Sequence, residues 1–383
     1  MKGNPVKDCI TMKKRIIVSV TNDLYTDQRV AKVCRFLVNE GFSVLLVGRL
    51  LPNSQAMPEL PYETKRMKLF FKRGPLFYAE YNLRLFFFLF FRRANVLLAN
   101  DLDTLLANYL ASWFKPKVQL VYDSHEYFTE VPELQGRKAK KVWEAIEGFI
   151  FPKLKNIYTV NQSIADLYHT KYGKTLRVVR NISPLWKPNT IASKEELGLP
   201  TDKPIIIIQG AGINVDRGAE EAVEAMREIN DAYLIFVGDG DVIPQLKIRV
   251  NELNLADKVL FYGKKPYQTL LQYTYHSSIG LTLDKDTNLN YKYSLPNKVF
   301  DYIHTNTAII ATDLVEIKRV VETHQVGIIL PQLTVEELRA AIIKLLKDAD
   351  QLQTYQANCN AVKNQLCWEN EESVLREIYR PLM

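Results

Sequence analysis

Short apolar segments alternate with amphipathic segments along almost the whole chain, and this alternation limits the possible folds more than any other feature. The stretch "RIIVSV" (15–20) has the length and apolar character of a buried strand. After it, five apolar residues recur with the period of one helix face, and Gly41 ends that helix before the strand "FSVLLVG". Such β-α-β units place their strands in a parallel sheet covered by helices on both faces. The sequence therefore predicts an α/β fold with doubly wound, Rossmann-like sheets.

The alternation forms two series, because the segment "NISPLWKPNTIASKEELGLPTDKP" (181–204) carries four prolines and no long apolar run. A chain of 383 residues is also long for a single core. We therefore predict a first domain at 1–185, a linker at 186–203, a second domain at 204–360 and a final amphipathic segment at 361–383. Two such sheets would face a central cleft, and open parallel sheets bind ligands beyond the carboxyl ends of their strands.

The composition is that of a folded globular protein, with 47% apolar and 24% charged residues. The four cysteines show neither metal-type nor disulfide spacing, so we expect them to be reduced. The first residues contain no apolar signal region, and Met12 offers an alternative start before the first predicted strand. The longest apolar run, "LFFFLFF" (85–91), is much shorter than the roughly 20 residues that span a bilayer. These features predict a cytoplasmic protein.

Residues 65–93 carry eight cations opposed only by Glu80, and eight minus one equals the net charge of +7 of the whole chain. The same segment is rich in Phe, Tyr and Leu. Cations attract anionic lipid and aromatic side chains enter the bilayer interface, so we expect this segment to bind the inner face of the cytoplasmic membrane peripherally. The alternative is a helix buried in the core. No nucleic-acid-binding motif accompanies the cations, so we expect no nucleic-acid partner.

In the second domain, "IIIIQGAGINVDRG" has the pattern of a strand, a glycine-containing loop and a helix start. Gly210 and Gly212 would let backbone N–H groups approach an anion. Arg217 is unfavourable beside a helix start unless an anion such as a nucleotide diphosphate lies there. The alternative is an ordinary solvated loop residue. Gly238 begins a second glycine turn on this donor side, and tight-turn geometry alone is a sufficient explanation for it.

The stretch "SLPNKVFDYI" (294–303) has the pattern of another helix start, signalled by Pro296. Free N–H groups of the first turn and the Lys298 ammonium group would bind phosphate. Asp301 follows about 5 Å further along the helix axis, a suitable separation for a carboxylate that binds ribose hydroxyls. On spacing alone, an exposed Lys–Asp pair is the simpler explanation.

In the first domain, polar residues follow buried strands and are expected to line the cleft. "YDSHEYF" places His125 and Glu126 after one strand, where Glu126 could orient His125 or contact the acceptor, and Asp101 follows another strand. In "TNDLYTDQRV", Asp27 is expected on the acceptor side, with a helix N-cap as the simpler explanation. Arg29 is expected to face an anionic acceptor.

Motifs in both halves, in their order and separation, resemble glycosyltransferase family 4, which has the GT-B fold. In the second half they are "GAGINVDRG", "LIFVGDG", "VLFYGKKPYQTLLQYTYHSSIGLTL" and "SLPNKVFDYIHTNTAIIATDLVEI". In the first half, "VTNDLYTDQRVAKVCRFLVNEGFSVLLVG", "ANDLDTLL" and "VYDSHEYFTEVPEL" resemble one bacterial branch of the family. The resemblance covers nearly the whole chain. It implies a GT-B fold whose final helix crosses back to the first domain.

The resemblance also implies roles for individual residues of the second domain. Arg217 matches a cation that holds the donor diphosphate. Two family glutamates that contact the donor sugar and ribose align with Tyr293 and Asp301, so this chain departs from the family at both positions. The "PNK" segment places Asn297 and Lys298 near the donor.

The implied reaction is transfer of a sugar, with retention, from a UDP- or GDP-sugar to a glycan or lipid-linked acceptor in cell-surface polysaccharide synthesis. His125 would hydrogen-bond the donor sugar, while Arg217 and Lys298 would stabilise charge on the leaving diphosphate. Three Asp-x-Asp patterns are present, but such pairs arise often by chance, so we expect neither a required metal nor another cofactor.

Two other functions are open on this architecture. A nucleotide-sugar 2-epimerase needs several acid/base groups in the cleft, and the chain has only five His residues. A catalytically inactive sugar-nucleotide-binding protein would be consistent with the departures at Tyr293 and Asp301.

Overall fold

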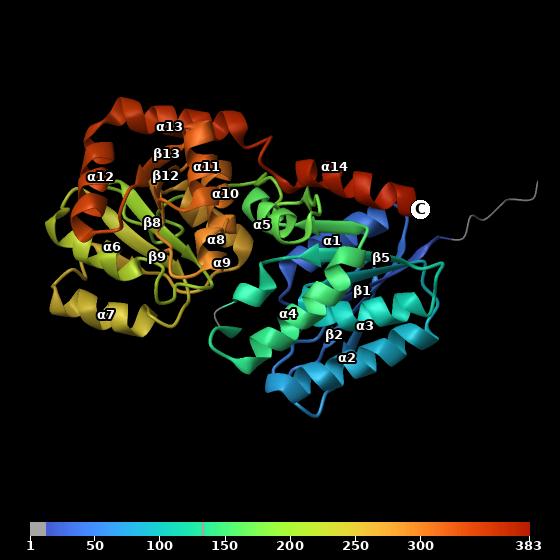
Figure 1. Ribbon diagram of the computed structural model, residues 1–383. Coiled ribbons are helices and arrows are strands. Elements are labelled where there is room, and N and C mark those ends of the chain that lie inside the picture. Colours follow the sequence, from blue (N-terminus) through green and yellow to red (C-terminus); the bar gives the residue numbers. More distant parts are fainter. Residues whose placement is uncertain (1–12, 132–133) are drawn as a thin grey trace, which may run out of the picture. The chain divides into compact units, whose positions relative to one another are not determined.

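The computed structural model describes residues 13–131 and 134–383, which form two compact units (Figure 1). Unit 1 contains the chain up to Val160, then Ala165–Val179 and Glu372–Met383, and unit 2 contains Asn161–Ile164 and Arg180–Glu371. The main division therefore lies at Val179/Arg180, slightly before the expected boundary at 185. Residues 361–371, expected with the final helix, belong to unit 2. Met12 and Cys9 lie outside the described residues.

Unit 1 is built on a seven-stranded sheet of order β3-β2-β1-β4-β5-β6-β7, in which every neighbouring pair is parallel. Its strands are β1 (Arg15–Asp23), β2 (Ser43–Arg49), β3 (Glu63–Met67), β4 (Val96–Asn100), β5 (Gln119–Ser124), β6 (Asn156–Thr159) and β7 (Arg177–Val178). Five of these strands coincide with short apolar runs of the sequence, such as "RIIVSV" and "FSVLLVG", whereas β3 and β7 do not. The sequence of β3, "ETKRM", is mostly polar because it forms an edge, and β7 has only two residues.

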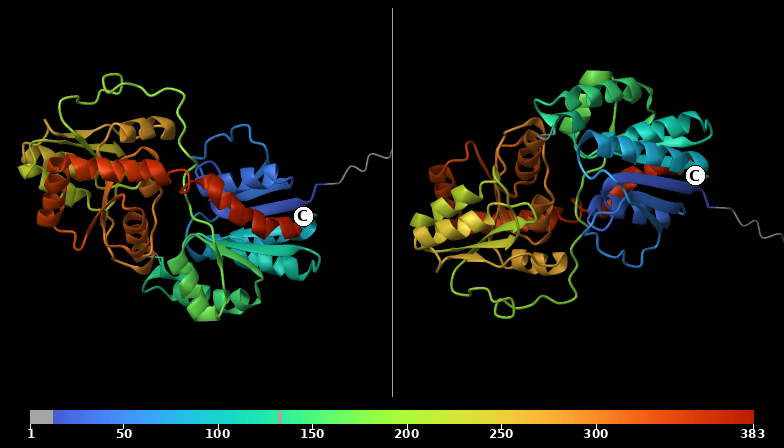
Figure 2. Two further views of the ribbon diagram at one scale, coloured as in Figure 1. Left: turned by 90° about the horizontal axis from the view of Figure 1, so that it is seen from above. Right: turned by 90° about the horizontal axis from the view of Figure 1, so that it is seen from below.

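Helices cover both faces of this sheet, as the alternating pattern predicts (Figures 1 and 2). The helices are α1 (Gln28–Asn39), α2 (Gly74–Phe91), α3 (Leu102–Trp113), α4 (Lys138–Ile150), α5 (Gln162–Tyr172) and α14 (Trp368–Tyr379). Helices α2 and α3 share one apolar core with β1, β2 and β4. The last part of α14 contacts α1, where Arg376 pairs with Glu40 at 2.8 Å and the Tyr379 ring meets Phe36. Tyr379 also lies 3.2 Å from Tyr158 of β6, hydroxyl to hydroxyl.

Helix α2 packs only one of its faces into the core. Its buried residues are Phe77, Tyr81, Leu85 and Leu89, which are spaced four apart. The alternative to membrane binding, a helix buried in the core, is therefore correct only for these four residues. Phe87, Phe90 and Phe91 on the same helix are exposed. Within the described part of the chain, no helix is long and apolar enough to cross a membrane.

Unit 2 contains a six-stranded parallel sheet of order β10-β9-β8-β11-β12-β13. Its strands are β8 (Ile205–Gly210), β9 (Tyr233–Gly238), β10 (Val259–Phe261), β11 (Ile279–Thr282), β12 (Ala308–Thr312) and β13 (Gly327–Leu330). Its helices are α6 (Ala219–Ala225), α7 (Ile243–Glu252), α8 (Tyr267–Tyr275), α9 (Leu289–Lys292), α10 (Asn297–His304), α11 (Val315–His324), α12 (Val335–Lys347) and α13 (Ala349–Val362). All six strands occur where the apolar runs predict them.

Alternate side chains of the unit 2 strands enter two separate cores. Ile206 and Leu234 pack with α6, α7 and α12, whereas Ile205 and Ile235 pack with α8, α10, α11 and α13. Burial of both strand faces explains why the strands read as continuous apolar runs. Two of the cysteines, Cys359 and Cys367, are free and buried here, as is Cys34 in unit 1.

The loops after β8 and β9 approach each other so closely that Gly238 has no room for a side chain. A Cβ atom at Gly238 would lie 1.8 Å from the carbonyl oxygen of Gly210, and its φ is +153°. Gly238 is therefore required by the contact between two loops and not only by its own turn.

We expect Gly238→Ala to lower the free energy of unfolding by about 2 kcal/mol or more, because backbone atoms must move apart to admit the methyl group. Gly148→Ala is the matched control, since it lies inside α4 with nothing within 4 Å of the added Cβ. That control is expected to be neutral or stabilising. Urea denaturation of both variants measures the difference, and equal stabilities would contradict the close-approach explanation.

Candidate active site

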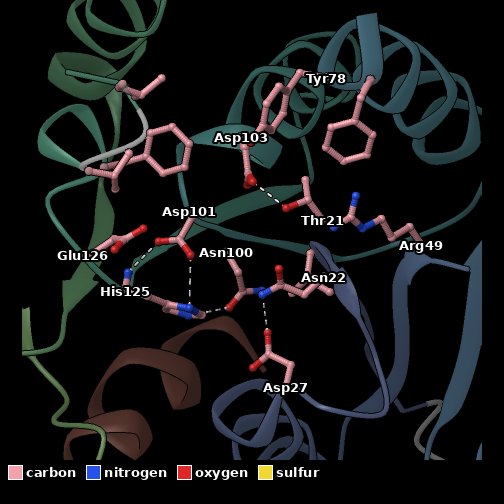
Figure 3. A pocket seen from close by; sticks show the side chains of 15 residues that line it. Thr21, Asn22, Asp27, Arg49, Tyr78, Asn100, Asp101, Asp103, His125 and Glu126 are labelled. Atoms are coloured by element: carbon pink, nitrogen blue, oxygen red, sulfur yellow. Dashed lines mark hydrogen bonds and ion pairs between the residues drawn. The ribbon is translucent and has the colours of Figure 1, made fainter. Parts of the chain in front are cut away.

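The carboxyl ends of β1, β2, β4 and β5 surround a pocket of about 350 Å³ in unit 1 (Figure 3). Parallel strands end together at one edge of their sheet, which brings residues distant in sequence into one site. The sequence-predicted residues Asp27, Asp101, His125 and Glu126 all line this pocket. Arg29 does not line it.

His125 follows β5 and lies between two carboxylates. Its Nδ1 is 3.2 Å from Asp101 Oδ2, and its Nε2 is 3.0 Å from Asp123 Oδ2 and 3.2 Å from Asn100 Oδ1. Burial would lower the pKa of His125, but Asp101 and Asp123 raise it well above the usual value. Both ring nitrogens therefore have a carboxylate partner, which favours the protonated ring, and the contact of His125 with the donor sugar stays a prediction.

Arg29 is buried in the interior of unit 1, so the expectation that it faces an anionic acceptor is wrong. Its guanidinium donates to both oxygens of Asp123, at 3.2 and 2.8 Å, and to the carbonyl of Val179 at 3.1 Å. Burial would raise the pKa of Asp123, but Arg29 and His125 lower it to about 2. Arg29 therefore neutralises a buried carboxylate inside unit 1.

Asp27 caps α1, as the simpler explanation predicts. Its Oδ1 accepts from the N–H of Val30 at 3.1 Å, and its Oδ2 accepts from Asn22 Nδ2 at 3.1 Å. Glu126 is partly exposed in the pocket, and its carbonyl accepts from Ser124 Oγ at 2.8 Å.

Asp103 is a pocket residue to which sequence reasoning assigned no role. Its carboxyl is buried in the first turn of α3 and accepts from Thr21 Oγ1 at 2.5 Å. Burial, together with nearby Asp101, raises the pKa of Asp103 to about 7. Perturbed carboxyl groups in clefts are typical of functional sites. The available signal was its place in "ANDLD", two residues after Asp101 at a strand end.

In unit 2, the fully buried carboxylate of Asp284 holds both predicted diphosphate-binding cations. Arg217 Nη1 lies 2.5 Å from Asp284 Oδ1, and Lys298 Nζ lies 3.5 Å from Asp284 Oδ2. Burial would raise the pKa of Asp284, but Lys298 and Arg217 bring it below the usual value. Arg217 also stacks over the ring of Tyr291 at 4.5 Å. In the sequence, Asp284 is marked only as part of one of the three Asp-x-Asp patterns, with Asp286.

Several polar atoms next to these cations have no hydrogen-bond partner among the described residues. They are Arg217 Nε, Ser294 Oγ and Asn297 Oδ1. Helix α10 begins at Asn297, one residue after the predicted start at Pro296. Buried polar groups are normally paired, so unpaired ones beside a helix N-terminus and two cations indicate a place for a polar ligand.

Gly210 and Gly212 lie in the loop after β8, where added Cβ atoms would meet nothing closer than 3.9 Å. Their neighbourhood is therefore open, and Gly210 has a φ of +133° that favours glycine. The predicted approach of an anion to this backbone stays a prediction.

Asp301 is placed differently from the ribose-binding role that the sequence suggests. Its side chain is 4% exposed, and it accepts from Ser183 Oγ at 2.9 Å, Tyr267 OH at 2.7 Å and Gln209 Nε2 at 2.9 Å. This network uses most of the acceptor capacity of the carboxylate, so Asp301 joins α10 to its neighbours, and its contact with the ribose stays a prediction. Tyr293 is the C-cap of α9, and its sugar contact stays a prediction.

Residues 13–131 and 134–383 contain no group of three His, Cys, Asp or Glu side chains arranged to hold a metal. The expectation that no metal is required stays a prediction.

Two family models match the chain, one in each half. "Glycosyl transferases group 1" matches residues 189–361, and "Glycosyltransferase Family 4" matches residues 27–182. Together they cover the chain from 27 to 361 apart from 183–188. A comparison with curated protein sequences gives no match.

Solved structures with the same fold cover nearly the whole chain. Sucrose-phosphate synthase from Thermosynechococcus elongatus is 17% identical with a TM-score of 0.77, and the match covers 97% of this chain and 99% of that one. HepE from Anabaena, solved with UDP-glucose, is 14% identical with a TM-score of 0.71 over 96% and 99%. WaaG, a glycosyltransferase involved in lipopolysaccharide biosynthesis, is 12% identical with a TM-score of 0.70 over 95% and 99%.

The two family models are both of glycosyltransferases, and they favour sugar transfer over epimerisation or binding alone. The chain belongs to the group 1 and family 4 glycosyltransferases and is a retaining enzyme of GT-B fold that uses a nucleotide-sugar donor.

Proposed function

We propose that unit 2 binds the diphosphate of a UDP- or GDP-sugar and that the sugar is transferred to a glycan or lipid-linked acceptor during cell-surface polysaccharide synthesis. The observation that carries the donor half of this proposal is the attachment of Arg217 and Lys298 to one buried carboxylate. Asp284 fixes the two cations side by side, so little reorganisation is needed when an anion arrives. Arg217 Nε, which has no partner among the described residues, would add a donor to the diphosphate, while Asn297 Oδ1 would accept from a hydroxyl or N–H group of the nucleotide-sugar.

The reaction breaks the bond from the anomeric carbon to the diphosphate oxygen and forms a bond from that carbon to an acceptor hydroxyl oxygen. Negative charge grows on the leaving diphosphate, and Arg217 and Lys298 bind it more strongly in the transition state than in the ground state. The leaving diphosphate takes the hydroxyl proton. The acceptor hydroxyl attacks the anomeric carbon on the same face from which the diphosphate leaves, so the anomeric configuration is retained.

We predict that Arg217→Ala lowers kcat by about 100-fold or more, because one preorganised charge-stabilising donor is lost. Arg227→Ala is the matched control, since Arg227 is exposed and pairs only with Glu224 at 3.6 Å among the contacts of the described residues. Release of UDP or GDP from the sugar donor is the measurement. Full activity of Arg217→Ala would overturn the donor-site assignment.

We infer that His125 acts as a fixed cation beside the transferred sugar. A folded-state pKa above the usual 6.5 means that the charged ring stabilises the fold fully below pH 6.5. This stabilisation is lost as the pH rises through the higher folded-state pKa. Asp103, with a pKa of about 7, has largely ionised by pH 8 and contributes little further change.

We predict that the free energy of unfolding falls between pH 7.5 and 8.5 by up to about 1.4 kcal/mol per pH unit. His125→Gln is expected to remove this slope, whereas His169→Gln on the surface of α5 is expected to keep it. Denaturant titrations at several pH values measure the slope. An identical slope in both variants would refute the buried imidazolium.

We also propose that the enzyme binds an anionic membrane surface through an aromatic surface formed by residues 65–93 with Trp113 and Phe114. The most exposed side chains are Phe70, Phe91 and Trp113, at 83%, 78% and 70%. The rings of Phe90 and Phe114 lie 5.8 Å apart, so the ends of α2 and α3 form one continuous patch. The cations of the segment complement anionic lipid, and a lipid-linked acceptor would lie in the same membrane.

We predict that the protein floats with vesicles containing about 30% anionic lipid at low salt and much less at 1 M salt, because salt screens the cations. Phe70→Ser combined with Phe91→Ser is expected to abolish flotation. Ile248→Ser, an exposed apolar residue of α7, is the control. Equal recovery with uncharged vesicles, or unchanged flotation of the double variant, would contradict the proposal.

A further inference from the structure

The pocket of unit 1 combines an acidic lining with an aromatic wall, and the structure holds all of its groups in place. Asp103 and Asp101 approach from the end of β4, and Glu126 from the end of β5 (Figure 3). Asp27 lies at the start of α1. Thr21 and His125 fix two of these carboxyl groups by the contacts described above.

The lining charge of this pocket is negative. Four carboxyl groups line it, against the two cations Arg49 and His125, and the balance stays negative although Asp103, with a pKa of about 7, is only partly ionised at neutral pH. His125 lies between Asp101 and Asp123, so its charge is already matched. The Arg49 guanidinium lies over the ring of Phe77 at 4.7 Å, and its buried Nε has no hydrogen-bond partner among the described residues, so of the two lining cations only Arg49 has a charge that no carboxylate of those residues contacts. A phosphate or carboxylate entering here would meet more like charges than opposite ones, which weakens its binding.

Aromatic rings also line the pocket, and Tyr78 lies beside Asp103 (Figure 3). Phe77, Tyr78 and Phe128 line it, and the ring of Tyr78 is held edge-on against Trp143 at 5.2 Å. Flat apolar rings suit the C–H face of a pyranose, while carboxylates accept hydrogen bonds from its hydroxyl groups. The volume of about 350 Å³ is enough for one or two sugar rings.

We propose that this pocket binds an uncharged sugar ring as the acceptor, and that phosphorylated and carboxylated groups are excluded from it. This inference rests on the proposed transfer function and narrows its acceptor. The hydroxyl group that attacks belongs to a sugar already present on the acceptor. A lipid phosphate therefore is not the attacking group, and an earlier glycosyl- or glycosyl-phosphate-transferring reaction must supply the first sugar.

The test uses the full chain with UDP or GDP present and compares methyl glycosides of common hexoses with the corresponding hexose 6-phosphates and with farnesyl phosphate. Saturation-transfer NMR measures binding, and transfer from UDP- and GDP-sugars measures turnover. We expect methyl glycosides to bind and accept sugar, with the phosphorylated compounds at least about tenfold weaker.

Variants that remove one carboxylate from the pocket then test whether charge repulsion excludes phosphorylated sugars. Asp103→Asn and, separately, Glu126→Gln are expected to improve binding of hexose 6-phosphate relative to methyl glycoside by about tenfold, a gain that loss of structure would not produce. Glu63→Gln, an exposed carboxylate of β3 outside the pocket, is expected to change nothing. Glu126 is partly exposed, so its variant keeps the test valid if Asp103→Asn fails to fold.

The outcomes separate the two proposals. If neither UDP nor GDP raises the melting temperature and no donor is consumed, the proposed function fails. If the donor binds but hexose 6-phosphates or farnesyl phosphate bind or react as well as methyl glycosides, only the acceptor inference fails. Failure of both acceptor classes with a bound donor also rejects it.

Discussion

In each sheet, one completely buried carboxylate lies at the carboxyl end of a strand. The candidate site depends on which cations neutralise these two carboxylates. Asp123 lies between Arg29 and His125, and Asp284 lies between Arg217 and Lys298. A buried carboxylate without partners would be too costly to keep ionised, so each one demands cations at the strand end. In unit 2 these cations are the groups that we propose bind the donor diphosphate. In unit 1 the buried carboxylate of Asp123 holds one of its cations, His125, at the edge of a pocket.

The same arrangement assigns different roles to cations that look alike in the sequence. Arg29 and Arg217 both precede or begin a helix after the first strand of a domain. Arg29 is 5% exposed and has all its contacts inside unit 1. The side chain of Arg217 is 25% exposed and retains a nitrogen without a partner among the described residues. Only the second of the two can serve an incoming anion, although both neutralise a carboxylate.

The sequence predicts the fold well because both sheets are covered on two faces, so their strands appear as apolar runs. It fails at the edges, where β3 is polar and β7 is short. At the site, strand-end position correctly selects His125, Asp101 and Glu126 for the pocket. Sequence spacing could not show which side chains are buried. In the structure, the buried carboxylate of Asp301 accepts hydrogen bonds from Ser183, Tyr267 and Gln209. The carboxylate of Asp284 is also buried, and it pairs with two cations.

The last residues of the chain complete unit 1, with Arg376 on Glu40 and Tyr379 against Tyr158. During synthesis these residues leave the ribosome only after all of unit 2 has been made. Part of the hydrophobic surface of unit 1 therefore stays uncovered until translation ends. The two units cannot complete their folding one after the other in the order of the sequence.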